Sequence, residues 1–184
     1  TPSPPSGAPA AGMAAGFARS RSGAVAAAAA AVSAFDLGIV LDPERLRSTV
    51  AEVAAAGFRE PLLASYRQGA ELLRQRLAID TVPKPVYFVK TAVVGYRVDR
   101  YSDDAATVAI WNVGVIGSGA TVQPQQSWST QRVGLAWEDG TWKVTAFASE
   151  AGPTPPLGNA EAATGASELF RDVPTFDGFS HATP

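Results

Sequence analysis

The chain has 184 residues, of which 46% are hydrophobic and 17% are charged, and its formal net charge is -2 at pH 7. This length accommodates one domain with a sizeable core plus terminal segments. The small net charge and the lack of a basic stripe argue against nucleic acid as a partner, and the absence of cysteine excludes disulfides, thiolate metal sites and cysteine nucleophiles.

The single histidine, His181, lies near the end of a mostly polar C-terminal segment, so we interpret it as a solvated residue. A metal site with several histidines is therefore excluded, and a Ser-His-Asp triad is not expected. The sequence predicts no catalytic, cofactor-binding or metal-ligating residue and no cofactor.

Residues 1–16 are rich in proline, serine and alanine and carry no charged side chain, which is typical of a linker. A linker of this kind often follows a membrane anchor or a secretion signal. The apolar stretch 23–41 is mostly alanine and is broken by Ser33 and Asp36, so it would insert poorly into a bilayer. We expect contact with a membrane only through an anchor upstream of Thr1.

Two helices are expected between residues 22 and 57. The high helix propensity of alanine favours a first helix from about Ser22 to Leu37, with Gly38 as its C-cap. A second helix begins with Asp42 as N-cap and Pro43 at the first helical position, and we expect Gly57 to end it. Its buried stripe is predicted to be Leu46, Val50 and Val53.

A third helix is expected from about Pro61 to Ala78. Its apolar side chains recur near the helical period and predict a core stripe of Leu62, Tyr66, Ala70, Leu73 and Leu77. Its charged side chains are expected to point elsewhere: Arg67, Glu71, Arg74 and Arg76. In the first helix, the unbroken alanines 26–31 offer a face that lets another element approach closely.

Beyond residue 85 the pattern changes to the period of two that is typical of strands. We expect strands at 86–101 and 105–117, joined through 102–104, both longer than the usual five or six residues. Residues 118–126 are expected to form a loop. Three glycines lie in mid-strand positions where they permit bulges: Gly95, Gly114 and Gly134.

The stretch "WEDGTWKV" predicts a tight hairpin, because a type I′ turn needs positive φ at both central positions and Asp139-Gly140 tolerates this. Alternation in the preceding strand places Val133, Leu135 and Trp137 on one face, and Trp128, Thr130 and Arg132 on the other. In the following strand, Trp142, Val144, Ala146 and Ala148 are expected opposite Lys143, Thr145 and Phe147.

Three helices followed by four antiparallel strands, with a last hairpin of this form, resemble the nuclear transport factor 2-like (cystatin-like) superfamily. The hairpin motif is carried here by Trp137, Asp139, Gly140, Trp142, Lys143 and Val144. The resemblance implies an α+β domain over residues 17–152, with three N-terminal helices packed on a curved four-stranded antiparallel sheet that forms a cone. It implies little about function, because this fold hosts enzymes and binding modules alike.

The string "GFARSRSGA" and the alanine-rich helix after a proline-rich lead look like extracytoplasmic proteins of actinobacteria, some of which accompany conjugation or type IV secretion machinery. This resemblance implies a non-catalytic scaffold or protein-interaction domain. Its expected partners are other proteins of a membrane-associated assembly, or further copies of itself. One alternative is a small-molecule binder, or an isomerase- or hydrolase-type enzyme, that uses a cone interior lined by residues such as Trp111 and Tyr96. A third reading is a cytosolic binding module.

Two groups of polar residues are candidate sites of chemistry. Arg97, Asp99 and Arg132 are expected to cluster, which we interpret as cross-strand ion pairs on a solvated face. Asn112 lies among apolar residues and is expected to be a buried structural amide, with a ligand contact as the alternative. No carboxylate lies within a clearly apolar strand face, which argues against general acid-base catalysis.

Residues 153–184 form a C-terminal tail in which a short helical turn is expected at 166–170. The tail is too rich in large apolar residues for a purely solvated segment: Leu169, Phe170, Val173, Phe176 and Phe179. We expect part of it to dock on the domain or on a partner.

Overall fold

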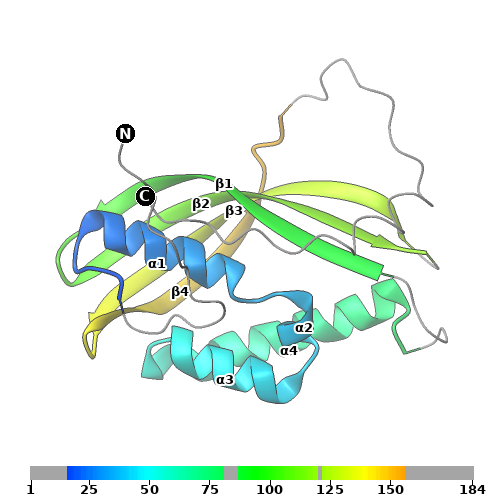
Figure 1. Cartoon of the computed structure of the whole chain (residues 1–184), viewed down its shortest axis with the longest axis horizontal. Helices are drawn as coiled ribbons and strands as arrows, with labels where there is room; N and C mark the ends of the chain where they lie inside the picture. Colours follow the sequence, from blue (N-terminus) through cyan, green and yellow to red (C-terminus); the bar gives the residue numbers. More distant parts are fainter. Residues whose placement is uncertain (1–15, 81–86, 120–121, 156–184) are drawn as a thin grey trace, which may run out of the picture.

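The computed structural model describes residues 16–80, 87–119 and 122–155. Its elements in chain order are α1 (Arg21–Ser33), α2 (Leu37–Val40), α3 (Pro43–Val53), the 3-10 turn η1 (Ala56–Phe58), α4 (Arg59–Leu77), β1 (Tyr87–Tyr101), β2 (Ala105–Ser118), β3 (Val122–Glu138) and β4 (Thr141–Ala151). The strands form one antiparallel sheet in the order β1-β2-β3-β4. The predicted α+β class is therefore confirmed (Figure 1). Nearly all of the expected linker and tail, including the turn at 166–170, lies outside the described residues.

The first helix ends earlier than the sequence analysis expected, and Gly38 does not cap it. Helix α1 stops at Ser33, and the carboxylate of Asp36 accepts a hydrogen bond from the backbone N–H of Ile39 at 2.8 Å. Asp36 is thus the N-cap of the separate short helix α2, which contains Gly38. The alanine-rich composition correctly predicted a helix over the alanine run. It gave no sign that Asp36 would start a second helix.

The caps of α3 follow the prediction at its start and differ from it at its end. Asp42 accepts hydrogen bonds from the N–H groups of Glu44 and Arg45 at 3.0 and 3.1 Å. The helix ends at Val53, not at Gly57, because residues 54–55 turn to pair with β4: Ala54 is bridged to Val144, whose carbonyl accepts from the N–H of Ala55 at 2.9 Å. A contact distant in sequence therefore ends this helix. The expected stripe of α3 is buried.

Helix α4 forms close to its predicted bounds. It ends at Leu77, and Ala78 is its left-handed C-cap, with φ of 54°. Leu62, Leu63, Ala70 and Leu77 are buried, and the predicted stripe residues Tyr66 and Leu73 are partly buried.

The sheet is bent by bulges near two of the three predicted glycines. The β1–β2 register shifts between Val93 and Gly95, and the β3–β4 register shifts between Gly134 and Leu135. No shift occurs at Gly114. The expected loop at 118–126 is wrong in its second part, because β3 begins at Val122 and pairs with the far end of β2. The polar residues at the start of β3 have a low propensity for strands. They are extended because they pair with the end of the long strand β2.

The Asp139-Gly140 hairpin is confirmed, with φ of 52° and 79° at the two turn residues. The predicted faces of β3 hold, but those of β4 hold only for its first half. Because of the bulge beside Gly134, Phe147 pairs with the buried Val133 and is partly buried, whereas Ala146 is exposed. One extra residue reverses the alternation of every residue that follows it.

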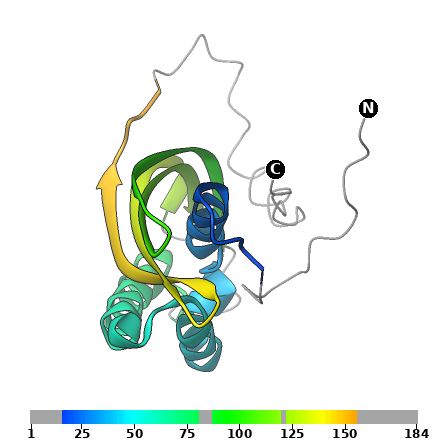
Figure 2. The ribbon, with the colours of Figure 1, turned by 90° about the vertical axis from the view of Figure 1, so that its left-hand side faces the viewer.

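The core lies between α1 and the concave face of the sheet. The sheet curls around α1, while α3 and α4 pack beneath it (Figure 2). Alanines 24, 27, 28 and 31 are at most 1% exposed and lie in one cluster with the inward side chains of β2, β3 and β4. The predicted role of the alanine run in close packing is confirmed. A second cluster joins α3 and α4 through Leu46, Val50, Ala54, Leu62 and Leu63.

Candidate functional site

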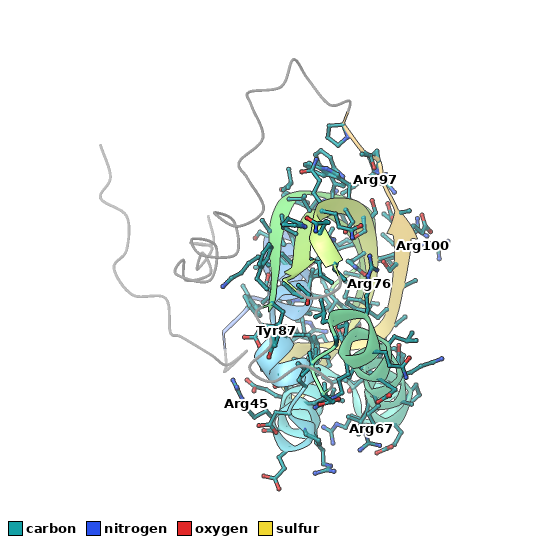
Figure 3. The ribbon with its side chains drawn as sticks, turned by 90° about the vertical axis from the view of Figure 1, so that its right-hand side faces the viewer. Arg45, Arg67, Arg76, Tyr87, Arg97 and Arg100 are labelled. Atoms are coloured by element: carbon teal, nitrogen blue, oxygen red, sulfur yellow. The ribbon has the colours of Figure 1, made fainter. Side chains whose placement is uncertain are left out.

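A cavity of about 660 Å³ lies between the end of α1, η1, α4 and the inner face of the sheet. This volume is in the range of pockets that hold drug-sized ligands. Arg76, in the last turn of α4, lines it. Figure 3 shows Arg76 on the side of α4 that faces the strands, and Arg67 on the side away from them.

The sheet side of the cavity carries uncharged hydrogen-bonding groups. Asn112 is 3% exposed and pairs across β2 and β3 with Ser129, whose hydroxyl donates to the Asn112 Oδ1 at 2.9 Å. The Asn112 Nδ2 donates to the carbonyl of Ile110 at 3.4 Å. Gln131 follows Ser129 on the same face and pairs with Ser149 of β4. The prediction of a buried polar group at Asn112 is confirmed, and its amide lines the cavity.

The helix side of the cavity is apolar and aromatic. The rings of Phe35 and Tyr66 are stacked with their centroids 4.1 Å apart, and Phe58 and Leu62 extend this wall. Burial raises the pKa of Tyr66 well above its ordinary value of 10.0. The phenol is therefore protonated at neutral pH and can donate a hydrogen bond, but it is a poor general base.

The cavity is not lined by the residues that the sequence analysis named for the cone interior. Trp111 neighbours Asn112 in a strand, so its side chain points to the opposite, outer face. Tyr96 pairs with Ile110 across β1 and β2, but it lies on the edge strand and is 65% exposed. Both expectations for the cavity are therefore wrong.

The predicted cluster of charges forms on the outer face of the sheet. Asp99 accepts from Arg97 Nε at 2.7 Å and from Arg132 Nε at 3.4 Å, and Arg132 Nη1 also contacts Glu150 at 2.9 Å. The hydrogen bond from Arg97 is the main reason that the pKa of Asp99 is lowered. The interpretation as a row of cross-strand ion pairs on a solvated face is confirmed, since three of the four side chains are at least 42% exposed.

Two tryptophans stack beside this row. The rings of Trp111 and Trp128 have centroids 4.8 Å apart. The chain after β4 continues along β3 and contacts this face: Trp111 Nε1 donates to the carbonyl of Pro153 at 2.9 Å, and the hydroxyl of Thr130 donates to the carbonyl of Gly152 at 2.8 Å. The indoles remain partly exposed.

Most of the cavity residues were not predicted from the sequence. Arg76 was expected to point away from the core stripe, yet its fourteen-residue separation from Leu62 places it nearly on the same side of the helix. Ser129 and Gln131 are in phase with the buried Val133, and this alternation could have placed them on the inner face. The partner elements of the cavity come from distant parts of the chain, and no local signal brings them together.

Among residues 16–80, 87–119 and 122–155, no three carboxylate or histidine side chains come together in a way that could hold a metal ion. None of the helices in the described part of the chain combines the length and apolar character that a membrane crossing requires.

Fold and cavity together define a mixed α+β domain in which helices cover one face of a four-stranded antiparallel meander and enclose a pocket there. The chain belongs to the family described as the domain of unknown function DUF8175, whose model matches residues 5–166.

No curated protein matches the chain in sequence. The crystal structure of the intermembrane space region of the chloroplast protein ARC6 is similar over 68% of this chain and 95% of that chain, at 14% identity and a TM-score of 0.41. A similarity at this level does not extend to function.

Proposed function

We propose that this chain is a non-catalytic, extracytoplasmic protein-interaction domain that self-associates through the outer face of its sheet. We further propose that it is a component of a membrane-associated assembly such as a conjugation or type IV secretion system. The assembly and the location rest on the resemblance of the N-terminal segment to actinobacterial proteins of that kind.

A nuclear transport factor 2-like cone is the architecture that we propose for this domain. The order of helices before strands, the curl of the sheet around α1 and the cavity beneath it support this assignment (Figure 2). The paired Trp137 and Trp142 on either side of the Asp139-Gly140 turn support it as well.

The observation that carries the interaction proposal is the stacked pair Trp111 and Trp128 on the outer face of the sheet. The described helices that pack on the sheet lie on its other face, and both indoles are partly exposed. Arg97 and Arg132 lie beside them on the same face. Tryptophan and arginine are the residue types that most often dominate the binding energy of protein interfaces.

Sedimentation velocity tests this proposal. We expect the wild-type chain to self-associate and Trp128→Ala to weaken the association at least about tenfold, the effect of losing one interface hot spot. Tyr96→Ala is the matched control, because Tyr96 is an exposed aromatic residue on the helix-covered side of the edge strand. A wild-type chain that stays monomeric at its highest soluble concentration would contradict the proposal, and so would equal effects of the two substitutions.

The proposed assembly has a test that needs no folded protein. The complete gene product should carry a membrane anchor or secretion signal before Thr1, and a secretion ATPase should be encoded beside it. A complete product that lacks both signals, from a gene with no secretion or conjugation genes around it, would exclude this part of the proposal.

The cavity alone favours a second candidate function. This function is small-molecule binding, or catalysis of the isomerase or hydrolase type. Proton transfer at neutral pH needs a suitably placed acid or base, most often a histidine or carboxylate. Among the described residues that line the cavity there is no aspartate, glutamate or histidine. We therefore propose binding, not turnover, as the role of the cavity.

A further inference from the structure

The outer face of the sheet holds a short segment of the chain's own backbone. Beyond the end of β4, the N–H of Gly152 donates to the carbonyl of Trp128 at 2.8 Å. The hydroxyl of Thr130 donates to the carbonyl of Gly152 at 2.8 Å, and Trp111 Nε1 donates to the carbonyl of Pro153 at 2.9 Å. Side chains of this face therefore donate to consecutive carbonyls of a segment that is neither helix nor strand.

The chemistry of these contacts suits a proline-rich ligand. Proline has a carbonyl acceptor but no N–H, so a surface that binds it needs only to supply donors. Proline-rich segments also lose little conformational entropy on binding, and surfaces built from aromatic side chains are their usual receptors. The stacked indoles of Trp111 and Trp128 supply the aromatic surface, and Trp111 Nε1 and Thr130 Oγ1 supply the donors.

The segment that contacts this face begins a short motif that recurs at the other end of the chain. Residues 153–156 read Pro-Thr-Pro-Pro, and residues 2–5 read Pro-Ser-Pro-Pro. Serine and threonine each carry one hydroxyl, so the two motifs offer the same backbone and nearly the same side chains. Residues 1–16 carry no charged side chain that would oppose binding beside the ion pairs of this face. A surface that holds one motif can therefore hold the other.

The N-terminal motif reaches this face more readily from a second copy of the chain than from its own. The chain enters the domain where the carbonyl of Ala18 accepts from Trp142 Nε1. Trp142 pairs with the β3 residue nine positions beyond Trp128, about 30 Å along the strand. Residues 6–16 span at most about 40 Å when fully extended, and the path must also cross from the inner face of the sheet to the outer one. A second copy meets no such limit.

We propose that the outer face of the sheet binds proline-rich segments, and that residues 2–5 of a second copy occupy it in place of the chain's own residues 153–156. The incoming motif lies over Trp111 and Trp128 and accepts hydrogen bonds from Trp111 Nε1 and Thr130 Oγ1. This inference rests on the proposed self-association through the same face and names the segment that enters it. The chain's own motif is then a competitor that limits the association.

A labelled peptide tests the site. The peptide has the sequence of residues 1–9, TPSPPSGAP, and fluorescence anisotropy measures its binding to the full chain. We expect the wild-type chain to bind it, and to bind at least about tenfold more weakly a peptide in which alanine replaces the three prolines of the motif. Trp111→Phe keeps an aromatic ring but removes the donor, so it should weaken binding roughly fivefold. Trp137→Phe is the matched control, because Trp137 packs against the core on the inner face.

A second variant tests the competition. Glycine in place of Pro153, Pro155 and Pro156 keeps the backbone carbonyls but makes the segment more flexible, so its contact with the face should weaken. We expect the peptide to bind this glycine variant at least about fivefold more tightly than the wild-type chain. Equal or weaker binding by the glycine variant would show that residues 153–156 do not compete, and would overturn the proposed exchange.

Sedimentation velocity of the full chain tests the second copy. Alanine in place of Pro2, Pro4 and Pro5 should weaken self-association about as much as Trp128→Ala does. If Trp128→Ala weakens association and the three alanines do not, the self-association proposal stands and this inference alone fails.

The remaining outcomes are read once near-ultraviolet circular dichroism shows that each variant is folded. Failure of the peptide to bind both the wild-type chain and the glycine variant overturns the inference, whatever the association state. An equal effect of Trp111→Phe and Trp137→Phe on peptide binding also overturns it. A chain that binds the peptide but stays monomeric, as wild type and as glycine variant, would contradict self-association and with it a second copy as the occupant.

Discussion

The indole Nε1 of Trp142 donates a hydrogen bond to the backbone carbonyl of Ala18 at 3.0 Å, across 124 positions of sequence. This bond joins the segment that leads into α1 to the hairpin that closes the sheet. Arg19 strengthens the same junction: its guanidinium lies 5.8 Å from the ring centroid of Trp137 and binds the carbonyl of Asp103 and the carboxylate of Asp104. The two tryptophans that flank the hairpin turn thus position the first helix against the sheet.

Replacing Trp142 by phenylalanine should therefore destabilise the domain. Trp142 is fully buried, so Trp142→Phe removes both core volume and the donor to Ala18, at a cost of about 1–3 kcal/mol. Trp137→Phe should cost less than about 1 kcal/mol, because Trp137 is only partly buried. Urea unfolding measures the free energy of unfolding of both variants. Equal losses would show that neither the bond to Ala18 nor the greater burial of Trp142 contributes to stability.

Gly23→Ala should destabilise the protein although alanine is the better helix former. A Cβ at residue 23 would lie 1.9 Å from the carbonyl oxygen of Ala18, so the lead-in segment would have to move. We expect a loss of about 1–3 kcal/mol, typical of overpacking. In Gly69→Ala the new Cβ meets nothing within 4 Å, and helix propensity should raise stability by about 0.5–1 kcal/mol. Thermal unfolding should show a lower melting temperature for Gly23→Ala and a higher one for Gly69→Ala. A higher melting temperature for Gly23→Ala would contradict the close contact with Ala18.

Ser129→Ala should destabilise the domain through Asn112. The change leaves the buried Asn112 Oδ1 without its donor, which should cost about 1–2 kcal/mol. A double-mutant cycle with Asn112→Ala should give a coupling energy of about 0.5–1.5 kcal/mol. Ser127→Ala, an exposed position on the same face, should cost less than about 0.5 kcal/mol. Strict additivity in the cycle would mean that the hydrogen bond does not contribute.

Asp99 should make stability depend on acid pH. Its pKa is lowered, chiefly by the hydrogen bond from Arg97, so its contribution is present above the ordinary carboxyl pKa of about 3.9 and is lost as pH falls through the lowered value. In Asp99→Asn, stability should decrease less as pH falls. The pair is largely solvated, so the urea midpoint should change by no more than a few tenths of a molar, and less in high salt. Glu138→Gln, an exposed acid at the end of β3, is the control. A profile of Asp99→Asn that follows the wild type below pH 4 would contradict the assignment.

The sequence by itself determined the elements whose signals are local. The Asp42-Pro43 start of α3, the Asp139-Gly140 turn and the apolar period of α4 each depend on a few neighbouring residues, and each was found in the structure. The ion pairs of Asp99 were also predictable, because strand alternation puts Arg97 and Asp99 on one face whatever lies across from them.

Only the tertiary structure decided where the bulge beside Gly134 falls, and with it that Phe147 faces the cavity. It also decided that α3 stops at Val53, where Ala54 and Ala55 pair with β4. The cavity itself brings Arg76 of α4 together with Asn112 and Gln131 of two strands. The physical reason is the same in each case: register and helix ends are set by pairing between segments far apart in the chain, and one residue of shift reverses the face of every side chain beyond it.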